Sequence, residues 1–172
     1  MSSFKLLRAT ALIVATASLS GCFQPLYGEA NHPGLVEDMR AIEVVQINGR
    51  VGHYLGDFLI TDLNGTGRTP KPKYKLVVTT SVGVATPTVE SQLNVADAAT
   101  VTLTASFVLS KIEGGAIVIA GVANSSAVYD RSAQRYADLR ANRDAEIRDA
   151  RSIANELELR IGAALAEQNA KK

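Results

Sequence analysis

The residue with the most specific chemical context in this sequence is Cys22, the only cysteine in the chain. It follows Leu19-Ser20-Gly21, and upstream of these lie Lys5, Arg8 and an apolar stretch from Ala9 to Leu19. A charged segment, a short apolar segment and small residues together are typical of a secretory signal peptide. A cysteine at the first mature position is typical of bacterial lipoproteins, in which the thiol is acylated before the peptide is cleaved. The sequence therefore predicts lipid attachment at Cys22.

The predicted signal peptide covers residues 1–21, and its apolar stretch is too short to span a bilayer as a helix. Cleavage would leave 151 of the 172 residues, and loss of Lys5 and Arg8 would leave 16 basic against 17 acidic side chains. A near-neutral chain of this length favours one domain and lacks the positive charge expected of a nucleic-acid-binding protein. No apolar run of 18 residues follows Cys22, so we expect the mature chain to be held at a membrane by its lipid.

Residues 22–40 are predicted to form an extended, lipid-anchored tether, because prolines and glycines recur along them. The folded domain is predicted to cover residues 41–168. It begins with a compact apolar strand, Ala41–Ile47, and continues with a helix over Arg50–Leu63, where apolar residues recur at spacings of three and four. Asn64-Gly65 is predicted to end this helix.

Three β-strands are predicted next, over Tyr74–Val84, Thr100–Leu109 and Ala116–Val128, and Glu113-Gly114-Gly115 predicts a hairpin turn between the last two. Apolar residues alternate with hydroxyl-bearing residues along the middle strand. Since alternate side chains point to opposite faces of a sheet, this pattern predicts one apolar face and one neutral, hydroxyl-rich face. The residues expected on the apolar face are Val101, Leu103, Ala105, Phe107 and Leu109.

A long helix is predicted from about Ser132 to Gln168, with one apolar stripe that needs a surface to cover. The element order β-α-β-β-β-α then predicts an α+β fold, a two-layer sandwich. Two helices would pack on one face of a mostly antiparallel four-stranded sheet. The other face would remain open to solvent or to a partner.

No catalytic or metal-binding constellation is evident, so we expect a protein that is not an enzyme and that has no cofactor. The two histidines, His32 and His53, have no second ligand at metal-binding spacing, and an envelope hydrolase would need a nucleophile and a base that the sequence does not show. Gly49, Gly52 and Gly56 follow a strand and open a helix, but their spacing fits neither GxGxxG nor a P-loop. Turn geometry and close packing are the favoured explanation of these glycines.

The long helix carries the acidic residues Asp144, Glu146 and Asp149 among several arginines. A metal or acid–base cluster is conceivable, but this pattern is typical of a solvated, ion-paired helix face. We therefore expect all three carboxylates to be exposed.

A basic run of Arg68, Lys71, Lys73 and Lys75 lies in a proline-containing loop that enters a strand. Two hypotheses remain open for it. The cations could bind the phosphates of an anionic glycolipid or an acidic loop of a partner. Alternatively, this is a solvated turn whose lysines protect a strand edge against aggregation.

The segment Gly21–Gly28, which reads GCFQPLYG, resembles the lipopolysaccharide-assembly lipoprotein family LptE in its alphaproteobacterial form. Members of that family often read GCGFxPLYG, and this chain lacks the extra glycine. The resemblance continues through Ile47–Leu59 and resumes from Ala123 to Asp130 and on to Glu146. These segments together extend over most of the mature chain.

The resemblance implies a role without a reaction. LptE lipoproteins sit within the lumen of the outer-membrane β-barrel LptD, as a plug and assembly aid, while lipopolysaccharide reaches the outer leaflet. The implied partner is thus an LptD-like barrel, and direct contact with lipopolysaccharide is ascribed to some members. The implied location is the outer membrane; Phe23, rather than Asp, after the cysteine agrees with the sorting rule of enteric bacteria. The alternative is an auxiliary lipoprotein of a lipid-transport ABC system.

Overall fold

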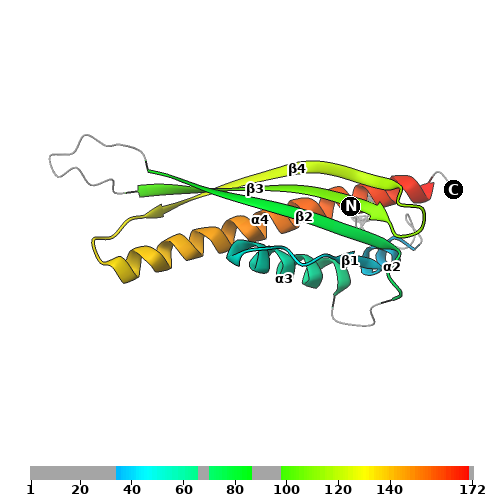
Figure 1. The fold of residues 1–172 in the computed structure, drawn as a ribbon, viewed down its shortest axis with the longest axis horizontal. Coiled ribbons are helices and arrows are strands. Elements are labelled where there is room, and N and C mark those ends of the chain that lie inside the picture. Colours follow the sequence, from blue (N-terminus) through cyan, green and yellow to red (C-terminus); the bar gives the residue numbers. More distant parts are fainter. Residues whose placement is uncertain (1–33, 66–69, 87–97, 171–172) are drawn as a thin grey trace, which may run out of the picture.

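The computed structural model describes residues 34–65, 70–86 and 98–170, in which helices and a mixed sheet form two layers (Figure 1). The sheet order is β1-β2-β3-β4; β1 is parallel to β2, and the other pairs are antiparallel. The elements in chain order are α2 (Leu35–Arg40), β1 (Ile42–Val44), α3 (Arg50–Asn64), β2 (Tyr74–Ala85), β3 (Ala98–Lys111), β4 (Ile117–Asp130) and α4 (Arg135–Ala170). The predicted α+β sandwich with helices on one sheet face is confirmed.

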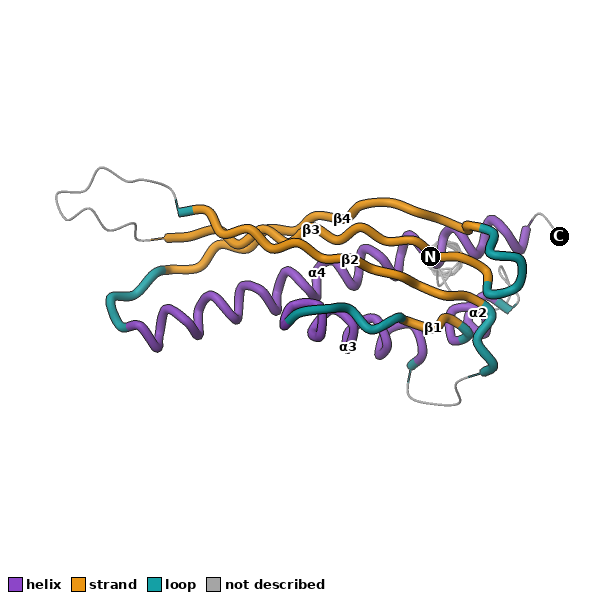
Figure 2. The backbone as a smooth tube through the Cα atoms, in the orientation of Figure 1, coloured by secondary structure: helices purple, strands orange, loops and turns teal. Residues whose placement is uncertain are grey.

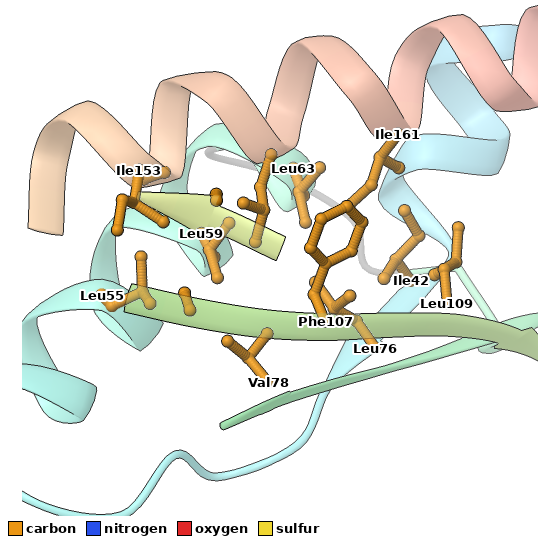
Figure 3. Close-up of a cluster of buried hydrophobic side chains, with 14 of the residues drawn as sticks. Ile42, Leu55, Leu59, Leu63, Leu76, Val78, Phe107, Leu109, Ile153 and Ile161 are labelled. Atoms are coloured by element: carbon orange, nitrogen blue, oxygen red, sulfur yellow. The ribbon is translucent and has the colours of Figure 1, made fainter. Parts of the chain in front are cut away.

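The inner face of the sheet carries the apolar residues predicted from the alternation in β3. All five of them are buried. Figure 3 shows Phe107 and Leu109 among side chains from α3 and α4, including Leu59 and Ile161. The predicted hairpin is also confirmed: β3 and β4 are joined by a turn in which Gly114 and Gly115 have φ of 78° and 66°, which glycine adopts without strain.

The two long helices cover the inner face unequally. Figure 2 shows α4 running along the sheet, whereas the shorter α3 lies beneath its middle and does not reach the end of β2 that is farther from β1. On β2, Tyr74 and Leu76 are therefore buried, while Val82 and Val84, on the same face, are 40% and 54% exposed. One end of β2 consequently lies beyond the cover of α3.

The N-terminal part of the domain differs from the prediction. Residues 35–40, expected within the extended tether, form α2, and Leu35 and Met39 are buried in the core. The strand expected over Ala41–Ile47 spans only Ile42–Val44. The apolar residues that suggested a longer strand instead lie in a helix turn and a loop, from which their side chains fill the core. A short apolar run does not reveal whether its residues form a strand or such a turn. The predicted signal peptide, Cys22 and most of the tether lie outside the described residues.

Gly52 allows a close approach between α3 and the segment that precedes it. A Cβ added at Gly52 would lie 2.7 Å from Cγ2 and 3.0 Å from the backbone oxygen of Ile47. Close packing therefore accounts for this glycine, as expected. No described helix is both long and apolar enough to cross a membrane.

Candidate functional site

The outer face of the sheet is an extended surface that no described helix covers (Figure 1). Alternation and register place the same kinds of side chain side by side on three strands. Between Lys75 at one end and Asp130 at the other, every outward residue is uncharged. They are Val77, Thr79, Ser81, Gly83 and Ala85 of β2, Thr100, Thr102, Thr104, Ser106 and Val108 of β3, and Ala120, Val122, Asn124, Ser126 and Val128 of β4.

This outer face has an apolar part and a hydroxyl-rich part. Val77 and Val108 are opposite each other in the register and are 42% and 37% exposed, and Val122 nearby is 49% exposed. Farther along, the Thr104 hydroxyl donates a hydrogen bond to the Asn124 side-chain oxygen at 2.8 Å. The face can therefore contact a polar or mixed surface without burying an unpaired charge.

A basic hollow of about 550 Å³ lies at one end of the sheet, where β2 begins and β3 ends. Three lysines line it, together with apolar groups and one carboxylate. The lining residues are Lys71, Pro72, Lys73, Tyr74, Lys111, Ile112 and Glu113. Ammonium groups beside apolar side chains suit a ligand that carries both an anionic group and a hydrophobic part.

Lys73 is held by the fold. Its Nζ lies 2.7 Å from Oδ1 of Asp38, a mostly buried residue of α2, and Asn169 of α4 donates to Oδ2 of Asp38 at 3.1 Å. The hydrogen bond to Asp38 is the main reason that the pKa of Lys73 is raised, and burial opposes it. Lys71 and Lys111 make no ion pair with any residue in the described ranges, so their charges remain available to a ligand.

The structure brings together only part of the predicted basic run. Lys71 and Lys73 line the hollow, Lys75 lies on the outer face of β2, and Arg68 falls outside the described residues. Lys111 was missed because it is far away in the sequence. The available signal was that Lys111 ends a strand that pairs with β2, the strand that follows the basic run. The register places Lys111 opposite Tyr74.

The expectation that the α4 carboxylates are all exposed is wrong for two of them. Glu146 and Asp149 are 5% and 1% exposed, whereas Asp144 lies on the surface. Glu146 accepts hydrogen bonds from Arg50, and Oδ1 of Asp149 accepts one from the Ser125 hydroxyl at 2.7 Å. Arg50 and Ser125 belong to distant elements, so helical periodicity alone could not identify these partners.

Asp149 is the more unusual of the two buried acids. Its Oδ2 is buried and makes no hydrogen bond. Desolvation raises the pKa of Asp149, although the hydrogen bond from Ser125 opposes the shift. Asp149 and Ser125 meet between α4 and β4, inside the packed layer, so their hydrogen bond has a structural role.

The histidine prediction was that neither residue belongs to a metal site. His53 is largely exposed and lies 3.4 Å from Asp57, one helical turn away, while His32 is outside the described residues. Within residues 34–65, 70–86 and 98–170, no three His, Cys, Asp or Glu residues are grouped as metal ligands would be. The surfaces that stand out chemically are therefore the outer face and the basic hollow.

Comparison with known proteins finds likeness in structure rather than in sequence. No family model and no curated protein matches the chain. A candidate lipoprotein from Caulobacter crescentus CB15 is similar over 81% of this chain and 98% of its own, with 27% identity and a TM-score of 0.64. Rare lipoprotein B from Shewanella oneidensis is similar over 76% of this chain and 98% of its own, with 11% identity and a TM-score of 0.53. The chain shares the fold of these two proteins.

Proposed function

We propose that this protein is a non-enzymatic lipoprotein, anchored in the outer membrane through Cys22, that partners an LptD-type β-barrel in lipopolysaccharide assembly. It would act as a plug and an assembly aid for the barrel. The lipid-attachment motif, the GCFQPLYG segment and the fold shared with lipoproteins support the class of protein. The observation that carries the role is the outer face of the sheet, which no described element covers and which is uncharged between Lys75 and Asp130.

The outer face suits the inside of a barrel for an electrostatic reason. Barrel interiors are polar, and a charged side chain buried there would need a partner. Hydroxyl and amide groups, such as those of Ser106, Thr104 and Asn124, can exchange water for hydrogen bonds with many polar surfaces. A long, neutral face of this kind tolerates burial in a polar interior.

The basic hollow would provide a second contact site, at one end of the domain. We propose that Lys71 and Lys111 bind an anionic group, either a glycolipid phosphate or a carboxylate on a loop of the partner. Lys73 would contribute its charge from a fixed position, because Asp38 orients it. The apolar groups of Pro72 and Ile112 would contact the hydrophobic part of the ligand.

A charge placed on the outer face tests the proposed contact. Ser106→Glu puts a carboxylate at an exposed position in the middle of that face, and Ser152→Glu makes the same change at an exposed position on α4. Burial of an unpaired carboxylate should lower recovery of the barrel with the tagged full-length protein by at least about tenfold for Ser106→Glu. Ser152→Glu should recover it as the wild type does. Equal recovery with both variants would refute contact through the outer face.

A further inference from the structure

The edge of β2 is a second open surface, distinct from the outer face. β1 pairs with β2 only at Tyr74, Lys75 and Leu76, and β2 continues to Ala85. Among the described residues, no strand, helix or loop makes a backbone hydrogen bond to the edge beyond Leu76. Within the described part of the chain, residues 78–85 therefore form a free strand edge.

The backbone groups that point out of this edge follow from the pairing. Tyr74 N–H donates to Ala41, and the Leu76 carbonyl accepts from Val45, so the even-numbered residues of β2 face β1. Since this direction alternates along a strand, the N–H and C=O groups of Val78, Thr80, Val82 and Val84 point to the free edge. Two of these residues, Val82 and Val84, are also substantially exposed.

The opposite edge of the sheet is protected, whereas no residue in the described ranges protects this one. On β4, the backbone oxygens of Val128 and Val122 accept hydrogen bonds from Arg148 and Arg160 of α4 at 3.0 and 2.9 Å. The β2 edge has no charged residue, no proline and no register shift between Val78 and Ala85. Natural proteins usually block such an edge, because it can pair with another strand.

Space is available beside the edge for the side chains of an added strand. A hollow of about 290 Å³ lies between β2 and the start of α3, with Thr80 and Val82 on one side and Gly49 and Gly52 on the other. Arg50 and Glu146 also line it, and their charges are paired with each other. An added strand would therefore fit with small or apolar, uncharged side chains directed toward this hollow.

We propose that the free edge of β2 accepts an extended, uncharged segment of the barrel partner as an added β-strand. This inference rests on the proposed function, because it names how that partner would be held. An edge of eight residues is small beside the 20–30 residues per side that a stable interface usually involves, so it would not hold two copies of this chain together by itself. The outer face adjoins this edge along β2, and one partner can engage both surfaces.

Proline at Val82 separates backbone pairing from side-chain contact. Val82→Pro removes an N–H that points to the edge but leaves the hydrogen bonds to β3 intact. Edge strands tolerate proline at such a position. Val82→Ala shortens the same side chain and keeps the N–H. In the full-length, lipidated protein, Val82→Pro should reduce co-purification of the barrel at least about fivefold, while Val82→Ala should stay within about twofold of the wild type.

The folded state of each variant is checked by thermal melting, and the pair Val84→Pro and Val84→Ala repeats the comparison nearer the strand end. Equal recovery of the barrel with the proline and alanine variants would overturn the edge proposal and leave the proposed function standing. Absence of the barrel from the wild-type preparation would instead refute the proposed function, and this inference with it. Rapid disulfide-linked dimers of Val82→Cys under oxidation would assign the edge to a second copy and overturn the proposal.

Discussion

Arg50 and Glu146 form a bidentate ion pair that joins the first residue of α3 to the first third of α4. Arg50 Nη2 lies 2.7 and 2.8 Å from the two carboxylate oxygens, and Nε lies 3.1 Å from one of them. The hydrogen bond to Glu146 is the main cause of the raised pKa of Arg50. The pair lines the same hollow as Thr80 and Val82, near the point where β2 loses the cover of α3.

Removal of Arg50 should be costly, because it leaves a buried carboxylate without its partner. We expect Arg50→Ala to lower the free energy of unfolding by about 1–3 kcal/mol, less than for a fully buried pair since Arg50 is half exposed. Urea titration measures this change. Asp144→Ala, which removes the exposed pair with Arg148, should change it by less than about 0.5 kcal/mol. Similar losses of unfolding free energy for both variants would show that the buried pair stabilises the fold no more than the exposed pair does.

Gly52 should tolerate no side chain, in contrast to Gly56 on the next turn. Gly52→Ala would force a methyl group against the backbone of Ile47, with an expected cost of about 1–3 kcal/mol. A Cβ at Gly56 would lie 4.0 Å from Cδ1 of Ile47, and alanine there should stabilise the helix by up to about 1 kcal/mol. Thermal or urea unfolding of the two variants checks the difference. Equal effects would contradict the close approach.

Asp149 should make stability depend on pH in the direction opposite to most carboxylates. Burial raises its pKa above the ordinary 3.8 in the folded protein, so the folded state holds the proton more tightly than the unfolded chain. Its stabilising contribution is complete below that ordinary value and is lost as the pH rises through the folded pKa. Asp149→Asn should therefore gain stability relative to the wild type between pH 4 and pH 7. A difference that is flat, or that falls over this range, would contradict the shift.

The basic hollow should bind anionic lipid through Lys71 and Lys111. The double variant Lys71→Glu/Lys111→Glu should weaken binding to vesicles containing lipopolysaccharide by at least about tenfold at low salt, because two attractive charges become repulsive. Arg135→Glu/Arg143→Glu makes the same charge change at exposed positions of α4. Lys73 is unsuitable for this test, because its loss would also break the ion pair with the carboxylate of Asp38. Equal weakening by both double variants would indicate a general charge effect rather than a site.

The sheet and its two main helices were predictable because each has a clear period. The alternation around Phe107 identified the inner face, and glycines at 114 and 115 identified the hairpin. Helix α2 was not predictable in the same way, because six residues are too few for a helical period. Its stability comes from burial of Leu35 and Met39 rather than from local propensity.

The surfaces were only partly predictable, because they depend on which distant residues meet. The neutral outer face followed from alternation, and Lys71 and Lys73 followed from the basic run. The addition of Lys111, the engagement of Lys73 by Asp38 and the burial of Glu146 depend on tertiary contacts between separate elements. The free edge of β2 depends on the shortness of β1 and on the starting point of α3, neither of which has a sequence pattern of its own.

The central claim is partnership with an outer-membrane barrel, and affinity purification tests it most directly. The full-length, lipidated protein with a C-terminal tag would be extracted in mild detergent and its partners identified by mass spectrometry. We predict a stoichiometric complex with a single LptD-type barrel from the outer-membrane fraction. Recovery of the protein as a monomer, or with an inner-membrane ABC transporter in place of the barrel, would contradict the claim.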